Sequence, residues 1–427
     1  MLQPPALGLC GRALAFNPYA ASHALARVRA AEPALLAWSH LPDPRALKPA
    51  SSGPLSGWAL GVKDNINVAG MPTRCGSAAS SPDTQVFDAS VVAQLRSAGA
   101  VPIGKTVTTE FAYVTPGPTR NPWQAGHTPG GSSSGSAAAV AAGLVPIALG
   151  TQTGGSMIRP AAFCGVVGFK PSAGLVSREG MHLTCESLDV IGWYGASVEH
   201  AQAVGRVLLP SSGARSKRLA DLRIAWLDAN PGHVMQPDAV AALSAAAGHL
   251  AGQVTQLRRM TEFPEHEELL QAHATLMHYE FARSLQGVAA VDRCRLSEPL
   301  LEAIRRGRAV KGEAYIAARQ LQLKSQQSWE ALFGEADLVL TSSALGTAPE
   351  GLQHTGDSAF NKGWSVLGWP CVHLPTVAAH GLPLGVLLVA KPYCDLDLLE
   401  WARQIHETID QRSCVIPDLF PQPKANP

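Results

Sequence analysis

The apolar positions of this chain follow two patterns: short continuous runs, and longer segments in which they recur every three or four residues. Leu25, Val28, Leu35 and Leu36 fall on one helical face and predict a helix over residues 21–38. Further segments of helical character cover residues 88–98, 136–142, 239–257, 269–285 and 396–409.

Short apolar runs lie between these segments and predict strands. The runs cover residues 60–62, 101–103, 145–149, 338–340 and 384–389. The run at 60–62 leads directly into Lys63 and Asp64, and the run at 145–149 leads into a Gly/Thr/Ser loop over residues 150–156. Because strands alternate with helices, we predict an α/β fold, a single large α/β/α domain with a central mixed β-sheet flanked by helices on both faces.

Changes in the character of the sequence suggest four parts. Residues 1–50 form an N-terminal helical segment, and residues 51–213 hold the Gly- and Ser-rich loops that carry the candidate chemistry. Residues 214–335 are helical with few turn signals and are expected to face the substrate. Residues 336–427 return to strands and loops, which indicates the C-terminal part of the same α/β core.

Composition narrows the classes of function. Apolar residues make up 46% of the 427 residues, enough for a large core. The 34 basic and 33 acidic residues give no basic excess, so no nucleic-acid partner and no membrane partner are expected. The longest strongly apolar stretch, residues 137–149, is shorter than the ~20 residues that cross a bilayer. The eight cysteines form no C-x-x-C pair and the N-terminus has no secretory pattern, so we expect reduced thiols and a cytoplasmic location.

Two local motifs point to other chemistry, and their context argues against both. Residues 99–106 spell the phosphate-binding loop of nucleotide-binding proteins, with Lys105 as its lysine. The interior of that stretch is strand-like and cannot wrap around a phosphate. Residues 131–135 spell the nucleophile elbow of α/β-hydrolases with Ser133 as nucleophile, but a loop precedes them where the elbow needs a strand.

Metal and cofactor chemistry has little support. His273 and His278 are five positions apart, whereas two metal ligands on one helical face are spaced i and i+4. We therefore expect neither a metal nor a cofactor.

Three segments taken together are far more specific. They are Gly-Val-Lys-Asp-Asn-Ile at residues 61–66, Pro-Gly-Gly-Ser-Ser-Ser-Gly-Ser at 129–136, and Gly-Thr-Gln-Thr-Gly-Gly-Ser at 150–156. In this order and at these separations they resemble the amidase signature family, and within it the general bacterial amidases. The similarity is close over residues 55–200, loose over 335–410 and slight over 215–335.

The resemblance implies roles for individual residues. Ser156 is the implied nucleophile, Ser132 is a bridging serine reached through a cis Gly131–Ser132 peptide, and Lys63 is the base. These residue types suit the chemistry, because a serine hydroxyl needs a base within hydrogen-bond reach. A lysine can be that base only where burial lowers its pKa enough to remove the proton.

Neighbouring residues are assigned supporting roles by the same resemblance. The expected oxyanion hole consists of backbone N–H groups in the nucleophile loop, those of Thr153, Gly154, Gly155 and Ser156. Gly131, Ser133 and Asp64 are expected to support the triad, and Asp189 to have a structural role. The alternatives are that Asp64 only caps a turn and that Ser133 only fills space.

The chain departs from the family pattern at three positions. Ser134 stands where many members have glycine, Gln152 stands where many have aspartate, and Arg159 lies one residue later than usual. None of these departures removes a member of the triad, so activity is expected, but they unsettle any transfer of substrate preference.

We therefore expect an amidase that hydrolyses a small-molecule carboxylic amide to an acid and ammonia or an amine through an acyl-enzyme intermediate. Two alternatives within the family are an allophanate- or carboxybiuret-type hydrolase and the glutaminase subunit of a tRNA-dependent amidotransferase. An alternative of another class, a catalytically silent binding protein of this fold, is disfavoured by the intact Lys63, Ser132 and Ser156. The oligomeric state is left open and includes a homodimer.

Overall fold

The computed structural model describes residues 21–47, 51–211, 213, 216–228, 234–263 and 265–409. The N-terminus on which the expected absence of a secretory pattern rests, and the outer ends of the predicted parts 1–50 and 336–427, lie outside these residues. Within the described part, no helix has the length and apolar character needed to cross a membrane.

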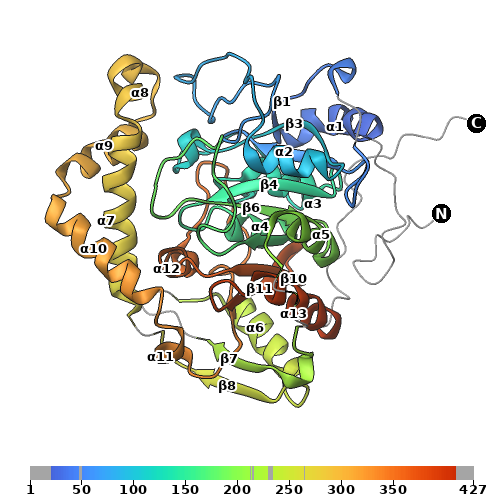
Figure 1. Cartoon of the computed structure of the whole chain (residues 1–427), viewed down its shortest axis with the longest axis vertical. Coiled ribbons are helices and arrows are strands. Elements are labelled where there is room, and N and C mark those ends of the chain that lie inside the picture. Colours follow the sequence, from blue (N-terminus) through green and yellow to red (C-terminus); the bar gives the residue numbers. More distant parts are fainter. Residues whose placement is uncertain are drawn as a thin grey trace, which may run out of the picture.

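One mixed sheet runs through the molecule (Figure 1). Its spatial order is β1-β3-β2-β4-β6-β5-β10-β11-β9-β7-β8. The strands are β1 (Trp38–His40), β2 (Ala59–Lys63), β3 (Val101–Thr106), β4 (Ile147–Gln152), β5 (Val167–Lys170), β6 (Val190–Gly195), β7 (Arg223–Leu227), β8 (Gln256–Met260), β9 (Leu338–Ser342), β10 (Cys371–Ala379) and β11 (Leu382–Ala390). Strand β2 pairs in parallel with both β3 and β4, whereas β4 pairs antiparallel with β6.

Helices surround this sheet. They are α1 (Ala21–Leu35), α2 (Ser90–Ser97), α3 (Ser134–Ala141), α4 (Ile158–Cys164), α5 (Val198–Leu208), α6 (Pro237–Leu250), α7 (His266–Ser284), α8 (Gln286–Val291), α9 (Glu298–Ala309), α10 (Gly312–Ser325), α11 (Trp329–Phe333), α12 (Ala359–Leu367) and α13 (Asp395–Thr408). Helices α7 to α10 form a separate group at one side of the sheet (Figure 1), and α7 packs against α9, α10 and α12.

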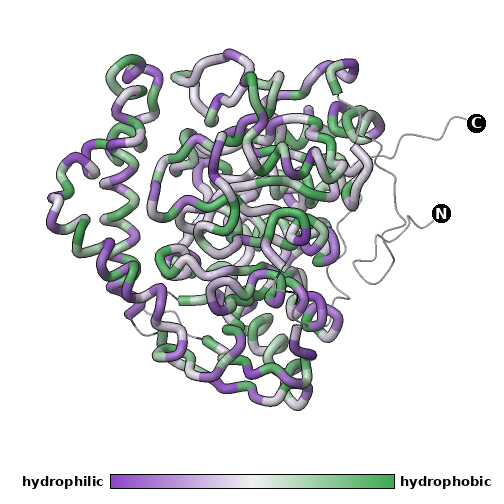
Figure 2. The backbone as a smooth tube through the Cα atoms, viewed as in Figure 1, coloured by the Kyte–Doolittle hydropathy of each residue, from purple (hydrophilic) through white to green (hydrophobic). Residues whose placement is uncertain are grey.

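Neighbouring residues of one strand pack into hydrophobic cores on opposite faces of the sheet, which shows that helices cover both faces. In β11, Val386 and Leu388 join the core made with α2, α5, α6 and α13, whereas Leu387 and Val389 join the core made with α7, α11 and α12. Strands buried on both faces carry continuous apolar runs. In Figure 2 the hydrophilic stretches accordingly lie mostly on the outer helices. The predicted α/β class with helices on both faces of a mixed sheet is confirmed.

Several element boundaries differ from the prediction. The helix expected over 21–38 ends at Leu35, because Leu36 adopts a left-handed conformation with φ of 55° and Trp38 begins β1. The helix expected over 239–257 ends at Leu250, and Leu257 lies in β8. That prediction was wrong because Gly252 at φ 79° ends the helical run and pairing with β7 makes the next residues a strand.

The strand expected over 145–149 is displaced towards the C-terminus. It begins at Ile147 and continues to Gln152, so the first three residues of the predicted 150–156 loop belong to β4. Pairing with β6 explains the extension, since Thr151 lies opposite Ile191 and Gln152 opposite Val190. Residues 214–335, expected to be helical, also contribute β7 and β8 to the sheet.

Close packing around α3 gives a prediction that separates helix propensity from steric fit. A Cβ atom at Gly135 would clash with the backbone at Ala37 and Val107, whereas one at Gly248 in α6 would meet no atom within 4 Å. Gly135→Ala should therefore lower the free energy of unfolding by about 1–3 kcal/mol. Gly248→Ala should leave it unchanged or raise it by about 0.5–1 kcal/mol, because alanine is the better helix former. Denaturant unfolding of both variants measures this; equal effects would contradict the packing described for α3.

Candidate active site

The candidate site lies where β2 and β4 end. Because these strands are parallel neighbours, their carboxyl ends meet at one edge of the sheet, which brings Lys63 close to Thr151. The Lys63 Nζ atom lies 2.7 Å from Ser132 Oγ and 2.7 Å from Thr151 Oγ1, and the lysine has no exposed surface. Asn65 Nδ2 also donates to Thr151 Oγ1, at 3.1 Å.

Burial changes the acid–base character of Lys63. Removal from water penalises the ammonium form and lowers the pKa of Lys63 to about 7, while the negative charge of Asp189 opposes that shift. The adjacent carboxylate, Asp64, is engaged elsewhere, because its Oδ1 atom pairs with Lys105 Nζ at 3.1 Å in a fully buried ion pair. Among the described residues, no carboxylate therefore contacts the Lys63 amine directly.

Lys105 has a structural position instead of a phosphate-binding one. Its Nζ atom donates to the Pro72 carbonyl and to Thr73 Oγ1, both at 2.9 Å, besides pairing with Asp64. Asp64 also accepts the Arg74 N–H at 3.1 Å. The lysine of the apparent nucleotide motif thus connects the end of β2 to the loop that follows it.

The two serine loops meet beside Lys63. The Gly131–Ser132 peptide is cis, as the resemblance predicted, and precedes α3. The Ser133 N–H donates to the Ser156 carbonyl at 3.3 Å, which joins the loops. The Ser133 hydroxyl donates to the Thr151 carbonyl and accepts the Thr151 N–H, each at 3.2 Å, and it has no exposed surface. These contacts leave Ser133 poorly suited to act as the nucleophile of an elbow.

Gln152 supports the nucleophile loop through both ends of its amide. Its Oε1 atom accepts the N–H groups of Met157 and Ile158, at 2.8 and 3.1 Å. Its Nε2 group donates to Ser365 Oγ at 3.1 Å, and that hydroxyl donates to the Gly154 carbonyl at 2.6 Å. Because a carboxylate only accepts, an aspartate could not donate to Ser365 in this way.

Arg159 ties the bridging-serine loop to the C-terminal part of the chain. It donates to the Gly131 carbonyl at 2.6 Å and to the Gly356 carbonyl at 2.8 Å. Burial lowers the pKa of Arg159 to about 10. At neutral pH the guanidinium therefore remains charged and holds both carbonyls.

Ser156 lies between β4 and α4 and keeps 8% of its surface exposed. On its N-terminal side, the Thr153 hydroxyl donates to Asp189 at 2.5 Å, and the Thr153 carbonyl lies 3.2 Å from His273 Nε2. Among the described residues, the backbone N–H groups of residues 153–156 donate no backbone hydrogen bond. A side chain at Gly155 would collide with Ser358, so the second glycine allows close packing there.

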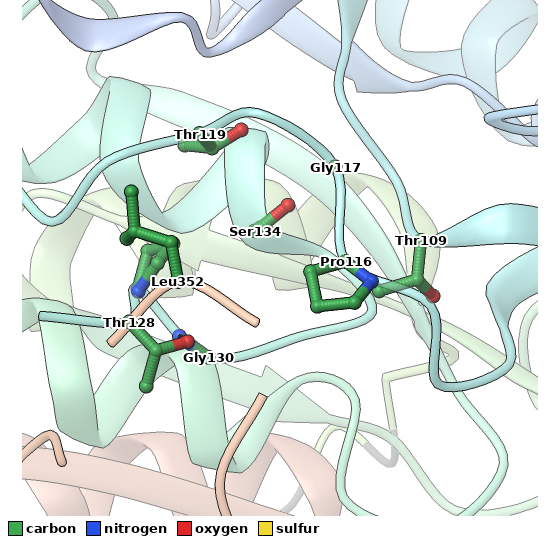
Figure 3. Close-up of a pocket in the computed structure, with 9 residues that line it drawn as sticks. Thr109, Pro116, Gly117, Thr119, Thr128, Gly130, Ser134 and Leu352 are labelled. Atoms are coloured by element: carbon green, nitrogen blue, oxygen red, sulfur yellow. Dashed lines mark hydrogen bonds between the residues drawn. The ribbon is translucent and has the colours of Figure 1, made fainter. Parts of the chain in front are cut away.

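A narrow recess, too tight to admit a water molecule, lies beside the loop that carries Ser132 (Figure 3). Gly130 and Ser134 line it together with Thr109, Thr128 and Leu352, whereas Ser132 and Ser156 do not. It is therefore separate from the implied nucleophile. In the described part of the chain, no three His, Cys, Asp or Glu side chains gather closely enough to hold a metal ion.

The structure brings together the segments of the predicted triad, but several of their partners were not foreseen. The position of Thr151 could have been inferred, because it precedes Ser156 in the same motif and lies near the end of a strand that runs parallel to β2. The pairing of Lys105 with Asp64, and the approach of His273 from α7, depend on long-range packing and carry no local sequence signal.

Comparison with known proteins agrees with this geometry. The family described as Amidase matches residues 19–399. The A subunit of the Glutamyl-tRNA(Gln) amidotransferase of Synechococcus sp. (strain RCC307) is 31% identical over an alignment of 451 positions, covering 91% of this chain and 93% of that protein.

Solved structures give the same result. The A subunit of the Glutamyl-tRNA(Gln) amidotransferase of Thermotoga maritima superposes with a TM-score of 0.79 at 26% identity, covering 93% of this chain and 92% of that one. The native peptide amidase of Stenotrophomonas maltophilia superposes with a TM-score of 0.76 at 28% identity, covering 92% and 94%. With a family match over most of its length and a buried lysine beside the motif serines, this chain belongs to the Amidase family, whose enzymes act on carbon–nitrogen amide bonds.

Proposed function

We propose that this protein hydrolyses a carboxylic amide to a carboxylic acid and ammonia or an amine, with Ser156 as nucleophile, Ser132 as proton relay and Lys63 as base. The observation that carries the proposal is the fully buried Lys63 amine, 2.7 Å from the Ser132 hydroxyl, with its pKa lowered to about 7. A large fraction of this amine is then neutral at physiological pH, which a general base requires.

The hydrogen-bond partners of Lys63 suit a neutral amine. Two N–H bonds can be directed at the Thr151 hydroxyl and carbonyl oxygens, 2.7 and 3.5 Å away, which leaves the nitrogen lone pair to accept from Ser132 Oγ. As Ser156 Oγ attacks the amide carbon, its proton passes to Ser132 and the proton of Ser132 passes to Lys63. The carbonyl oxygen of the substrate then carries a negative charge.

The oxyanion needs donors that are not already used. The backbone N–H groups of residues 153–156 are the candidates, because they donate no backbone hydrogen bond within the described part of the chain. Each such donor typically contributes ~2.7–4 kcal/mol of transition-state stabilisation. The Lys63 ammonium then returns a proton through Ser132 to the amide nitrogen, the carbon–nitrogen bond breaks, and the acyl group remains on Ser156. Attack by water through the same relay releases the acid.

A second candidate is hydrolysis of glutamine as the glutaminase subunit of a tRNA-dependent amidotransferase. It is favoured by the similarity to proteins of that name, which extends over 91% of this chain. The peptide amidase likeness has comparable coverage, so similarity alone does not separate the two. The second candidate would require partner subunits, whereas the first would not.

A substrate panel separates these candidates. We expect the purified chain alone to release ammonia or amine from simple carboxylic amides or peptide C-terminal amides at least tenfold faster than from L-glutamine or ureido substrates. Ser156→Ala serves as the control for background hydrolysis. Glutamine hydrolysis that appears only with added amidotransferase subunits would favour the second candidate, and preference for ureido substrates would favour an allophanate-type enzyme.

Removal of the nucleophile provides the direct test. Ser156→Ala should lower kcat at least ~1000-fold, because single losses within a serine triad have effects of this size or larger. A fluorophosphonate should label wild-type protein at Ser156, as read by peptide mass spectrometry. Ser134→Ala, at the start of α3, is the matched control, since its hydroxyl makes one weak contact of 3.4 Å to the Val107 carbonyl. Labelling at Ser133, or unchanged turnover in Ser156→Ala, would contradict the assignment.

The base assignment predicts a pH dependence with a definite sign. Because the neutral form of Lys63 is the active form and its pKa is lowered to about 7, kcat/KM should rise about tenfold per pH unit below 7 and level off above it. Lys63→Arg should be inactive throughout, since a guanidinium stays protonated. The pH–rate profile from about pH 5 to 10 measures this; a rise centred above about pH 9 would show that the residue is not desolvated.

A further inference from the structure

We propose that α7 positions the oxyanion-binding backbone of the site through His273 and Glu280. His273 holds the Thr153 carbonyl directly, and Glu280 holds the Thr153 hydroxyl through the turn at residues 184–189. This inference rests on the proposed amide hydrolysis and names what controls it. Neither residue is placed in contact with the reacting atoms, so both are positioning residues.

His273 acts on the backbone of Thr153. Burial, together with the positive charge of Lys362, lowers the pKa of His273 to about 3, so its ring is neutral. The Nε2 atom lies 3.2 Å from the Thr153 carbonyl, and its N–H therefore donates to that oxygen. A Cβ at Gly154 would lie 3.1 Å from the same Nε2 atom, so the His273 ring lies against the peptide bond between Thr153 and Gly154.

The geometry of the peptide unit gives this contact its consequence. In a planar trans peptide the C=O of one residue and the N–H of the next point in opposite directions. A donor that holds the Thr153 carbonyl towards α7 therefore turns the Gly154 N–H away from α7. Ser365 holds the next carbonyl, that of Gly154, at 2.6 Å, which directs the Gly155 N–H by the same rule. Two successive donors are thus oriented by side chains that lie outside the loop.

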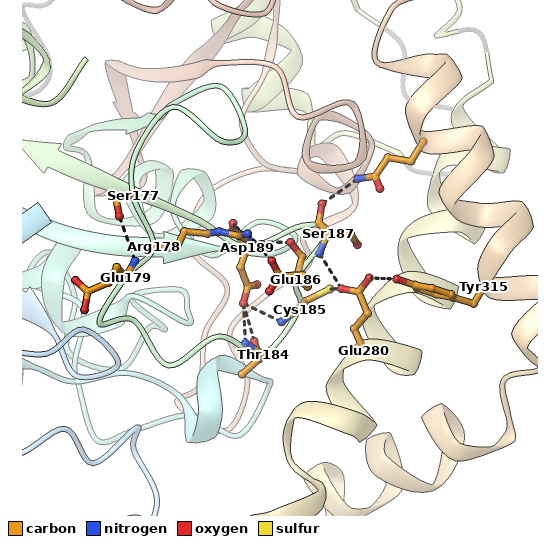
Figure 4. Close-up of polar contacts among 11 residues, drawn as sticks. Ser177, Arg178, Glu179, Thr184, Cys185, Glu186, Ser187, Asp189, Glu280 and Tyr315 are labelled. Atoms are coloured by element: carbon orange, nitrogen blue, oxygen red, sulfur yellow. Dashed lines mark hydrogen bonds and ion pairs between the residues drawn. The ribbon is translucent and has the colours of Figure 1, made fainter. Parts of the chain in front are cut away.

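Glu280 holds the turn at residues 184–189 (Figure 4), and this turn contacts the Thr153 side chain. Its Oε2 atom accepts the Ser187 N–H at 2.8 Å and the Cys185 thiol at 3.1 Å. That turn contains Asp189, which accepts the N–H groups of Thr184 and Cys185 through Oδ2, and the Thr153 hydroxyl through Oδ1 at 2.5 Å. Glu280 therefore holds the turn whose carboxylate holds Thr153.

His273 and Glu280 share one face of the helix. They are seven positions apart, which is two helical turns, and Leu276 between them is fully buried on the same face. The other Glu280 oxygen, Oε1, accepts the Tyr315 hydroxyl of α10 at 2.8 Å, and Gln322 of α10 donates to the Ser187 carbonyl at 3.0 Å. A displacement of the α7–α10 group would therefore reach Thr153 by two separate routes.

The test compares substitutions of His273 that keep or remove the donor. His273→Leu keeps much of the volume and removes the N–H, whereas His273→Gln can place an amide N–H near the Nε2 position. We expect His273→Leu to lower kcat about 10- to 100-fold with KM changed less than about threefold, because the affected N–H groups act on the transition state. His273→Gln should retain kcat within about threefold of wild type. Glu280→Leu should lower kcat in the same manner through the Thr184–Asp189 turn.

The matched control is His278→Leu on the same helix, since His278 makes no contact with the nucleophile loop among the described residues; it should keep wild-type kcat. Stoichiometry of fluorophosphonate labelling, one label per chain at completion, separates a slowed site from a misfolded one. Equal losses in His273→Leu and His273→Gln, or a Leu variant within about twofold of wild type, would overturn the inference for His273. Unchanged kcat in Glu280→Leu would overturn it for Glu280. Failure of wild-type protein to react with both amides and fluorophosphonate would instead remove the proposed function.

Discussion

Removal of the Lys63 amine from water is the constraint on which the site depends. The amine reaches its position because β2 and β4 are parallel and end at the same edge of the sheet. There the Ser132 hydroxyl and the hydroxyl and carbonyl of Thr151 contact it. An ionised carboxylate in direct contact would stabilise the ammonium and raise its pKa. The Asp64–Lys105 ion pair matters for this reason, since it keeps the adjacent carboxylate compensated while anchoring the loop after β2.

The side chains of Gln152, Arg159 and Ser365, and not the glycines themselves, hold the backbone of the two serine loops in place. Gln152 caps the start of α4, Arg159 holds the preceding serine loop, and Ser365 holds a carbonyl between the two glycines. Gln152 and Arg159 each make at least two hydrogen bonds to backbone groups. The loop can then carry glycines, which contribute no side-chain contacts of their own.

The sequence was informative where the chemistry is local and uninformative where it depends on packing. The strand before Lys63, the two serine loops and their cis peptide followed from contiguous motifs and the resemblance they carry. The helix predicted through Leu257 was wrong, because an alanine-rich segment followed by mixed residues does not reveal that β7 offers a partner edge. The sequence offered no role for His273 once its spacing from His278 argued against a metal site, and its contact with Thr153 is visible only in the folded chain. The fold class could therefore be predicted from the sequence, whereas the exact ends of the elements and the long-range contacts of the site residues could not.

The depressed basicity of Lys63 also bears on how robust the folded chain can be. In the unfolded state this amine is exposed and takes its proton freely at neutral pH, whereas the folded interior resists that proton until the pH falls to about 7. The difference between a pKa of about 7 and the usual value near 10.4 corresponds to about 4 kcal/mol of lost stability at neutral pH. This loss of stability disappears only in alkaline solution. In a chain of this fold without catalytic activity, replacing the lysine by an apolar residue would therefore stabilise the folded state. Keeping the amine therefore lowers the stability of the fold, a cost that only selection for catalytic activity would maintain.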